Sequence, residues 1–287
     1  MRKVKEFIIE NLILLCGIAS IFFVVLIFCF LMKEGLALFK TISLSDFIAG
    51  KSWYPISEPP ALGILPLILG SLLVTLGAAL ISIPIGIGCA IYIAEIAPAK
   101  LKEILKAGIE LLAAIPSVVL GFIGMVTLVP FVKTFFDLPT GLTAFTGSIM
   151  LAFMAMPTIV SIAEDALYSV PKTYKEGAFA LGATHWQTIY RVTLPAAKSG
   201  ILAAVMLGIG RVIGETMAVM MITGNAAVLP QSILVPVRTL TATIAAEMGE
   251  TVVGSEHYFA LFAIGIVLFI ISFCINVSAD LFLHKDK

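Results

Sequence analysis

Two charged residues, Arg211 and Glu215, lie within the otherwise uncharged stretch 199–223. A charge inside a lipid bilayer costs at least ~2.5–3.5 kcal/mol on insertion scales, so something must compensate it. The guanidinium of Arg211 offers a fork of donors that suits a tetrahedral oxyanion such as phosphate. Residues four apart share one face of a helix, so Glu215 is expected to approach Arg211. We predict an anion contact at Arg211, with Glu215 as its partner or gate; a purely structural ion pair is the alternative.

The composition identifies the elements that must position these residues. The chain is 60% hydrophobic and 13% charged, against about 25% charged residues in soluble domains. A spanning helix needs about 20 apolar residues, and the apolar windows lack the alternation of barrel strands. The sequence therefore predicts an all-α integral membrane protein with six transmembrane helices, in the windows 11–32, 59–94, 111–132, 138–163, 199–223 and 257–279.

The second window is longer than one ordinary span. It contains Pro66 and Pro84, and a proline inside a helix removes a hydrogen bond and bends the axis. We predict a helix over about 67–95 that kinks near Pro84, with two half-helices as the alternative.

Lysine and arginine counts predict the orientation. With six spans, one side holds twelve of these residues and the other holds five, namely Lys33, Lys40, Lys51, Lys133 and Arg238. Cytoplasmic loops carry the excess, so both termini and the loop before the fifth span are expected in the cytoplasm.

The loop before the fifth span, "EGAFALGATHWQTIYRVTLP", is polar between two apolar runs. Good helix formers precede Gly182, which permits a turn through positive φ, and Thr184 can cap a second short helix. Pro195 is expected to lead the chain into the fifth span, and Leu194 before it is expected to have a non-helical backbone conformation. A short helix facing water and a partner is predicted, with an unpartnered interfacial helix as the alternative.

This loop resembles the "EAA" loop of permease subunits of ABC importers, whose pattern is E-A-A, three residues, G, nine residues, I-x-L-P. The residues that occupy motif positions are Glu176, Gly177, Ala178, Gly182, Leu194 and Pro195. Gly177 replaces the second-position Ala, and Val192 replaces the Ile. The resemblance implies the type I (MetI-like) permease fold and a cytoplasmic coupling helix, in the loop at about 168–198, that docks on an ATPase.

Four further segments resemble the phosphate-specific importer permease of the PstC type: "LGILPLILGSLLVTL", "IELLAAIPSVVLGF", "GIGRVIGETMAVMMITGN" and "RTLTATIAAEMGE". This resemblance implies a phosphate permease in a bacterial or archaeal cell membrane. Its implied partners are a PstA-like second permease, a PstB-like ATPase dimer and an external, PstS-like phosphate-binding protein. It also implies two regions, a first helix with an extracytoplasmic segment at 1–66 and a five-helix permease core at 67–287.

The chain is expected to perform no bond chemistry. The stretch around Lys51 lacks the first glycine of a phosphate loop, so ATP and Mg²⁺ are expected on the partner ATPase, with no cofactor, metal or catalytic residue here. The apolar composition predicts contact with membrane lipid, and the zero formal net charge predicts no nucleic-acid surface. Arg238 is a second candidate on the substrate pathway, although a headgroup or structural contact fits it equally. Permeases for sulfate or molybdate, a secondary anion carrier, and a non-transporting scaffold or sensor subunit remain open.

Overall fold

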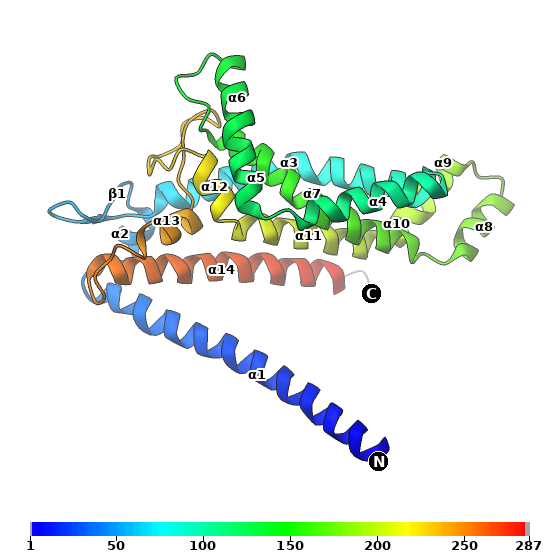
Figure 1. The fold of residues 1–287 in the computed structure, drawn as a ribbon, viewed down its shortest axis with the longest axis horizontal. Helices are drawn as coiled ribbons and strands as arrows, with labels where there is room; N and C mark the ends of the chain where they lie inside the picture. Colours follow the sequence, from blue (N-terminus) through cyan, green and yellow to red (C-terminus); the bar gives the residue numbers. More distant parts are fainter. Residues whose placement is uncertain (1, 285–287) are drawn as a thin grey trace.

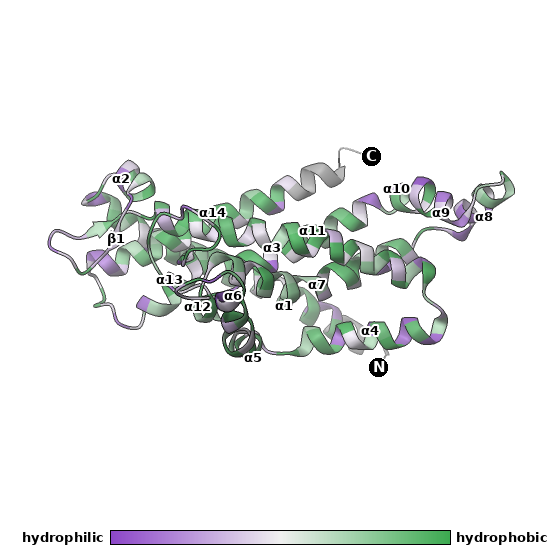
Figure 2. Cartoon of the chain, turned by 90° about the horizontal axis from the view of Figure 1, so that it is seen from above, coloured by the Kyte–Doolittle hydropathy of each residue, from purple (hydrophilic) through white to green (hydrophobic). Residues whose placement is uncertain are grey.

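The computed structural model describes the backbone of residues 2–284 and the side chains of residues 9–278. Its centre is a set of helices that run side by side along the long axis of the molecule (Figure 1), namely α3 (Leu65–Ile91), α7 (Ala144–Tyr168), α11 (Lys198–Gly214) and α14 (Glu256–His284). Hydrophobic residues dominate these helices, whereas hydrophilic residues gather toward the two ends of the molecule (Figure 2).

Within the described residues, five helices are long and apolar enough to span a membrane. The segments His185–Ala196 and Lys198–Gly214 form a sixth if they are counted as one span bent by 70°. The prediction of an all-α protein with six spans is therefore confirmed. The fifth predicted window, 199–223, is wrong in its boundaries, because the bend lies before it and the helix Lys198–Gly214 ends within it.

Small residues allow α3, α7 and α11 to approach closely around Ile159 of α7. A Cβ atom added at Gly86 of α3 would lie 2.8 Å from Ile159 Cγ2, and one at Gly208 of α11 would lie 2.4 Å from Ile159 Cγ1. Ile159 is fully buried. Close approach at small residues is the usual way in which helices associate in membranes, and it makes these three helices one packed unit.

Among the side chains that the structure describes, those in the C-terminal part of the first helix, α1 (Arg2–Ala37), pack on α14. There Gly35 lies against Ile266 and the rings of Phe30 and Phe262 meet edge to face at 5.5 Å. Toward its N-terminus α1 diverges from α14 (Figure 1), and its apolar side chains are exposed.

The end of the molecule opposite α8 (Lys172–Ala180) is built from short elements around a buried Trp53. They are η1 (Leu38–Lys40), α2 (Leu44–Ala49), the antiparallel strands β1 (Trp53–Tyr54) and β2 (Ala61–Leu62), and α13 (Leu240–Glu247). Phe47, Leu62 and Leu261 of α14 belong to the same core cluster. This end therefore has its own small core, which closes over the start of α3.

The predicted continuous helix in the second window is confirmed. α3 starts at Leu65, includes Pro84 and continues as a π-helical turn, η2 (Tyr92–Ile96), so the alternative of two half-helices is not adopted.

The prediction of a span over 111–132 is wrong in its boundaries. The helix breaks at Pro116, whose backbone is extended (φ −59°, ψ 138°) and which has no N–H to continue the ladder. Residues before the break belong to the amphipathic α4 (Ala99–Ala114). The span itself comprises α5 (Ser117–Ile123), η3 (Gly124–Leu128) and α6 (Val129–Phe135), which turn away from the direction of α3 and α7 (Figures 1 and 2).

The remaining elements belong to the polar loop and to the region after the fifth span. They are α8 (Lys172–Ala180), α9 (His185–Thr188), η4 (Ile189–Thr193), α10 (Leu194–Ala196) and α12 (Met217–Ile222).

Candidate functional site

The polar loop folds as two arms joined by a tight turn beyond the ends of α3, α7 and α11 (Figure 1). Gly182 has φ +81°, as predicted from its type. Thr184 caps α9 through a capping box, in which its side chain accepts from the Gln187 N–H and the Gln187 side chain accepts from the Thr184 N–H. The helix, turn and capped second helix that were predicted for this loop are thus confirmed.

The predicted conformation of Leu194 is wrong. Leu194 is helical (φ −61°, ψ −49°), and its N–H bonds to the Ile189 carbonyl across the π turn η4. Pro195 occupies the first turn of α10, where a missing N–H has little cost. The chain bends after α10, near Ala197, and not at Leu194. A π turn supplies the extra residue that lets the helix continue up to the proline.

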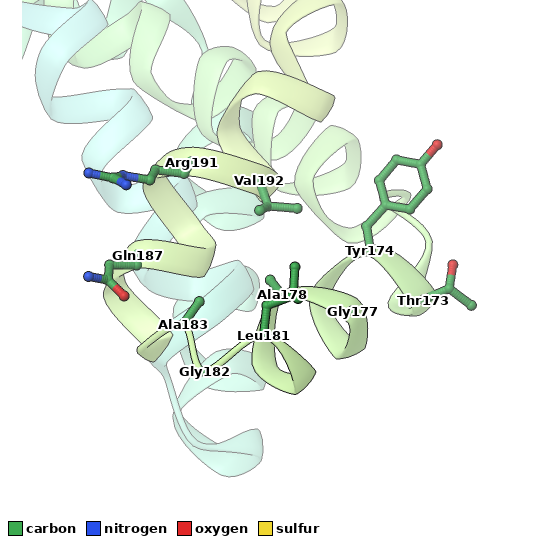
Figure 3. A pocket seen from close by; sticks show the side chains of 10 residues that line it. All are labelled: Thr173, Tyr174, Gly177, Ala178, Leu181, Gly182, Ala183, Gln187, Arg191 and Val192. Carbon is green, nitrogen blue, oxygen red and sulfur yellow. The ribbon is translucent and has the colours of Figure 1, made fainter.

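Between the two arms lies an open hollow of about 570 Å³. Figure 3 shows Ala178 of α8 and Leu181, which directly follows α8, on one side and Val192 of η4 on the other, with the Gln187 and Arg191 side chains extending away from α8. Gly177 and Gly182 line the same hollow. Of the residues at "EAA" positions, Gly177, Ala178 and Gly182 thus line the hollow, whereas Glu176, Leu194 and Pro195 are not among its lining residues.

This loop exposes large apolar side chains. Leu181 is 91% exposed, Trp186 66% and Tyr190 72%, although Glu176 and Lys172 on the neighbouring arm are exposed charges. Apolar residues grouped on a polar, protruding element mark an interaction surface. The geometry fits a protein partner better than a helix that merely lies on lipid.

Ion pairs tie this end of the molecule together. Lys102 and Lys106 of α4 lie 2.9 and 2.8 Å from the buried carboxylate of Glu164 on α7. The hydrogen bond to Glu164 raises the pKa of Lys106 above its ordinary value, against the opposing effect of burial. Lys175 of α8 lies 2.6 Å from Glu95 of η2. α4 and α8 are both held to spanning helices by charge.

Arg211 lies in the last turn of α11, about 20 Å along the helix from its start. Its side chain is exposed on the chain's surface, and its Nη1 donates to the Thr158 hydroxyl of α7 at 3.4 Å. Among the residues with described side chains, no carboxylate lies within 4 Å of this guanidinium. A charge on an apolar span that has no carboxylate near it within residues 9–278 calls for water, an anion or another subunit.

The predicted approach of Glu215 to Arg211 is wrong. α11 ends at Gly214, and Glu215 is extended (φ −69°, ψ 131°), so the four-residue spacing no longer places both side chains on one helical face. The Glu215 carboxylate instead accepts from the Ala218 N–H at 3.2 Å, and its carbonyl accepts from the Thr241 hydroxyl at 2.8 Å. Glu215 fixes the break between α11 and α12.

Arg238 takes part in a polar cluster at the β-hairpin end. Its Nε donates to the Asn225 carbonyl at 3.1 Å, and its Nη1 forms a short ion pair with Glu247. Glu247 also receives the Trp53 indole N–H at 3.1 Å and contacts His257 Nε2 at 2.8 Å. Of the uses considered for Arg238, the structure shows the structural contact.

Sequence reasoning missed Thr158, Glu95 and Lys175. Thr158 is one hydroxyl in an apolar window, and nothing in the sequence pairs it with Arg211. Glu95 and Lys175 stand 80 residues apart. One signal was available in the sequence, because Glu95 directly follows an uncharged window. A carboxylate at that position lies at a membrane boundary and needs a polar or charged partner.

Comparison with known proteins agrees with this geometry. The family model described as "Binding-protein-dependent transport system inner membrane component" matches residues 82–285. A Bacillus subtilis (strain 168) protein, "Probable ABC transporter permease protein YqgH", is 43% identical over 95% of this chain and 89% of its own length. "Phosphate transport system permease protein PstC" of Mesorhizobium japonicum is 37% identical over 84% of this chain and 78% of its own length.

Solved structures share the fold. A chain of a bacterial alginate ABC transporter, in complex with an alginate pentasaccharide-bound periplasmic protein, aligns with a TM-score of 0.67 over 99% of this chain and 96% of that chain, at 16% identity. A chain of the MetNI methionine ABC transporter, in an inward-facing conformation, aligns at 0.61 over 81% of this chain and 100% of that chain, at 20% identity. The loop, the bent fifth span and these matches together show that the chain belongs to the family of inner-membrane permease components of binding-protein-dependent ABC transport systems.

Proposed function

We propose that this chain forms part of the phosphate path of an ATP-driven importer, as a PstC-type permease subunit. The observation that carries the proposal is the guanidinium of Arg211, which stands on an apolar span with a hydroxyl as its described partner. An oxyanion supplies both the charge and the acceptor geometry that such a fork needs. The phosphate permeases among its relatives favour phosphate over sulfate or molybdate.

Arg211 contacts the anion in this proposal, and Glu215 acts through the backbone. By fixing the break between α11 and α12, Glu215 holds Arg211 at the very end of α11. In this proposal Arg238 contributes to the phosphate path only indirectly, because its charge is already neutralised by Glu247.

The expected assembly contains a PstA-like second permease, a PstB-like ATPase dimer and a PstS-like external binding protein. The ATPase docks on the loop from α8 to α10 in the cytoplasm and carries ATP and Mg²⁺, and this chain binds no cofactor. The start of α1 and the end of α14 lie toward the same end of the molecule as α8 (Figure 1). That arrangement supports an orientation with both termini in the cytoplasm.

The test is phosphate uptake by the reconstituted assembly with Arg211→Gln and Arg211→Lys. Each charge-assisted hydrogen bond is worth about 1.5–3 kcal/mol, so loss of the fork in Arg211→Gln should lower uptake about 100-fold or more. Arg211→Lys keeps the charge without the fork and should fall between this variant and wild type. Co-purification of all subunits serves as the control for assembly.

Unchanged uptake in Arg211→Gln would remove the anion contact. Competition by excess sulfate would assign a different oxyanion. Uptake that persists without any ATPase subunit would show a secondary carrier instead.

A further inference from the structure

Lys175 and Glu95 form an ion pair between the polar loop and a spanning helix. The Lys175 Nζ and Glu95 Oε1 atoms are 2.6 Å apart, and the side chains are 24% and 6% exposed. Charge-assisted bonds of this length are stronger than neutral ones. The carboxylate is nearly buried, so it depends on this lysine for its charge partner.

Lys175 provides an attachment that α8 otherwise lacks. No residue of α8 is buried, and its main packing partners are α9 and η4 of the same loop. Among the residues with described side chains, Lys175 is the one on α8 that bonds to a spanning helix through a polar group. A displacement of α8 is therefore transmitted to α3 and its continuation η2 chiefly through the Lys175–Glu95 ion pair.

Glu95 is placed by the π turn η2 at the end of α3. One additional residue in a turn rotates the following positions by about 100° relative to an α-helix. Two residues earlier, Ile93 is buried in a cluster with Val160 of α7 and Ala197 at the bend before α11. The carboxylate is therefore joined rigidly to α3.

α3 in turn packs against the helices that carry Arg211 and its neighbour. Gly86 of α3 and Gly208 of α11 both lie against Ile159 of α7, which adjoins Thr158. Close-packed contacts of this kind transmit small movements because they cannot be compressed.

We infer that the Lys175–Glu95 pair is a positioning contact that transmits movement of α8 to α3 and on to the Arg211 region. The inference rests on the proposed function in one respect, that the ATPase binds the loop containing α8. Separating the pair would leave a buried carboxylate without a counter-charge, which is strongly unfavourable. α8 and α3 therefore move together.

The test uses the full reconstituted importer with Lys175→Met, Glu95→Gln and the charge-swapped variant Lys175→Glu with Glu95→Lys. Lys100→Met is the control, because Lys100 is an exposed lysine on α4, outside the loop from α8 to α10. Two quantities are measured, phosphate uptake and the stimulation of ATP hydrolysis by the external binding protein.

Loss of a charged hydrogen bond changes an equilibrium about ten- to hundredfold. Uptake and stimulation should both fall by that factor in the two single variants, while the ATPase still co-purifies. Lys100→Met should match wild type, and the charge swap should recover to within about twofold. If a single variant fails to assemble, the uptake and the ATPase stimulation of the charge-swapped variant test the inference in its place.

Equal behaviour of Lys175→Met and Lys100→Met would overturn the inference, as would a charge swap that assembles yet stays as impaired as the single variants. Failure of the proposed substrate has a different signature. Wild type would then take up no phosphate, while the stimulation of ATP hydrolysis would still separate Lys175→Met from Lys100→Met.

Discussion

Glu247 joins three segments at the β-hairpin end, and replacing it tests whether Arg238 is structural. Its carboxylate is the shared acceptor for Trp53 of β1, Arg238 before α13, and His257 in the first turn of α14. Glu247→Gln keeps the size of the side chain and removes its charge. The arginine is then left without its counter-charge in a site where its side chain is only 20% exposed.

The magnitude follows from this burial. Removing one member of a largely buried ion pair costs about 3–5 kcal/mol. In a chain of this size each kcal/mol lowers the unfolding midpoint by about 2 °C, so the midpoint should fall by about 6–10 °C. Glu250→Gln is the control, since Glu250 is exposed three residues further on, and its midpoint should stay within about 1 °C.

Tryptophan fluorescence provides the assay. The chain has two tryptophans; Trp53 is 2% exposed and Trp186 is 66% exposed. In a Trp186→Phe background, the emission reports on Trp53 inside the cluster. A midpoint for Glu247→Gln equal to that for Glu250→Gln would refute the assignment of Arg238 to a structural cluster.

Two glycine pairs give further predictions. Gly182→Ala places a side chain at φ +81° at a cost of about 1–2 kcal/mol, so affinity for the ATPase should fall about five- to thirtyfold in a pull-down titration; Gly177→Ala, helical and with open space around it, should bind as wild type does or more tightly. Equal affinities would contradict a required turn. Gly208→Ala brings Cβ to 2.4 Å from Ile159 and should destabilise the chain by about 1–3 kcal/mol in thermal unfolding, whereas Gly210→Ala, with no atom within 4 Å, should not. Equal midpoints would show that the packed unit can relax.

The sequence predicted the parts of the fold that depend on local chemistry. Apolar length identified the spans, and residue type alone predicted the turn at Gly182 and the cap at Thr184. These features need no distant partner, because a positive φ or a capped N–H is determined within a few residues.

The errors occurred where the helical period is interrupted. The expectation that Arg211 and Glu215 share a face assumed a continuous helix, and the break after Gly214 is supported by Thr241 from a segment 26 residues away. Leu194 was expected to be non-helical because Pro195 follows it. The π turn η4 before Leu194 instead lets the helix continue up to the proline. The pair between Lys175 and Glu95 depends on tertiary packing, which a single sequence does not record.

The π turn η4 also affects how this chain is compared with its relatives. It holds one residue more than an α-helical turn would need between Thr188 and Leu194. A homologous helix without that turn requires a one-residue gap at this place if its buried side chains are to stay aligned with those here. An ungapped alignment with such a helix would shift every position of the preceding arm, including Glu176, Ala178 and Gly182, against its true counterpart.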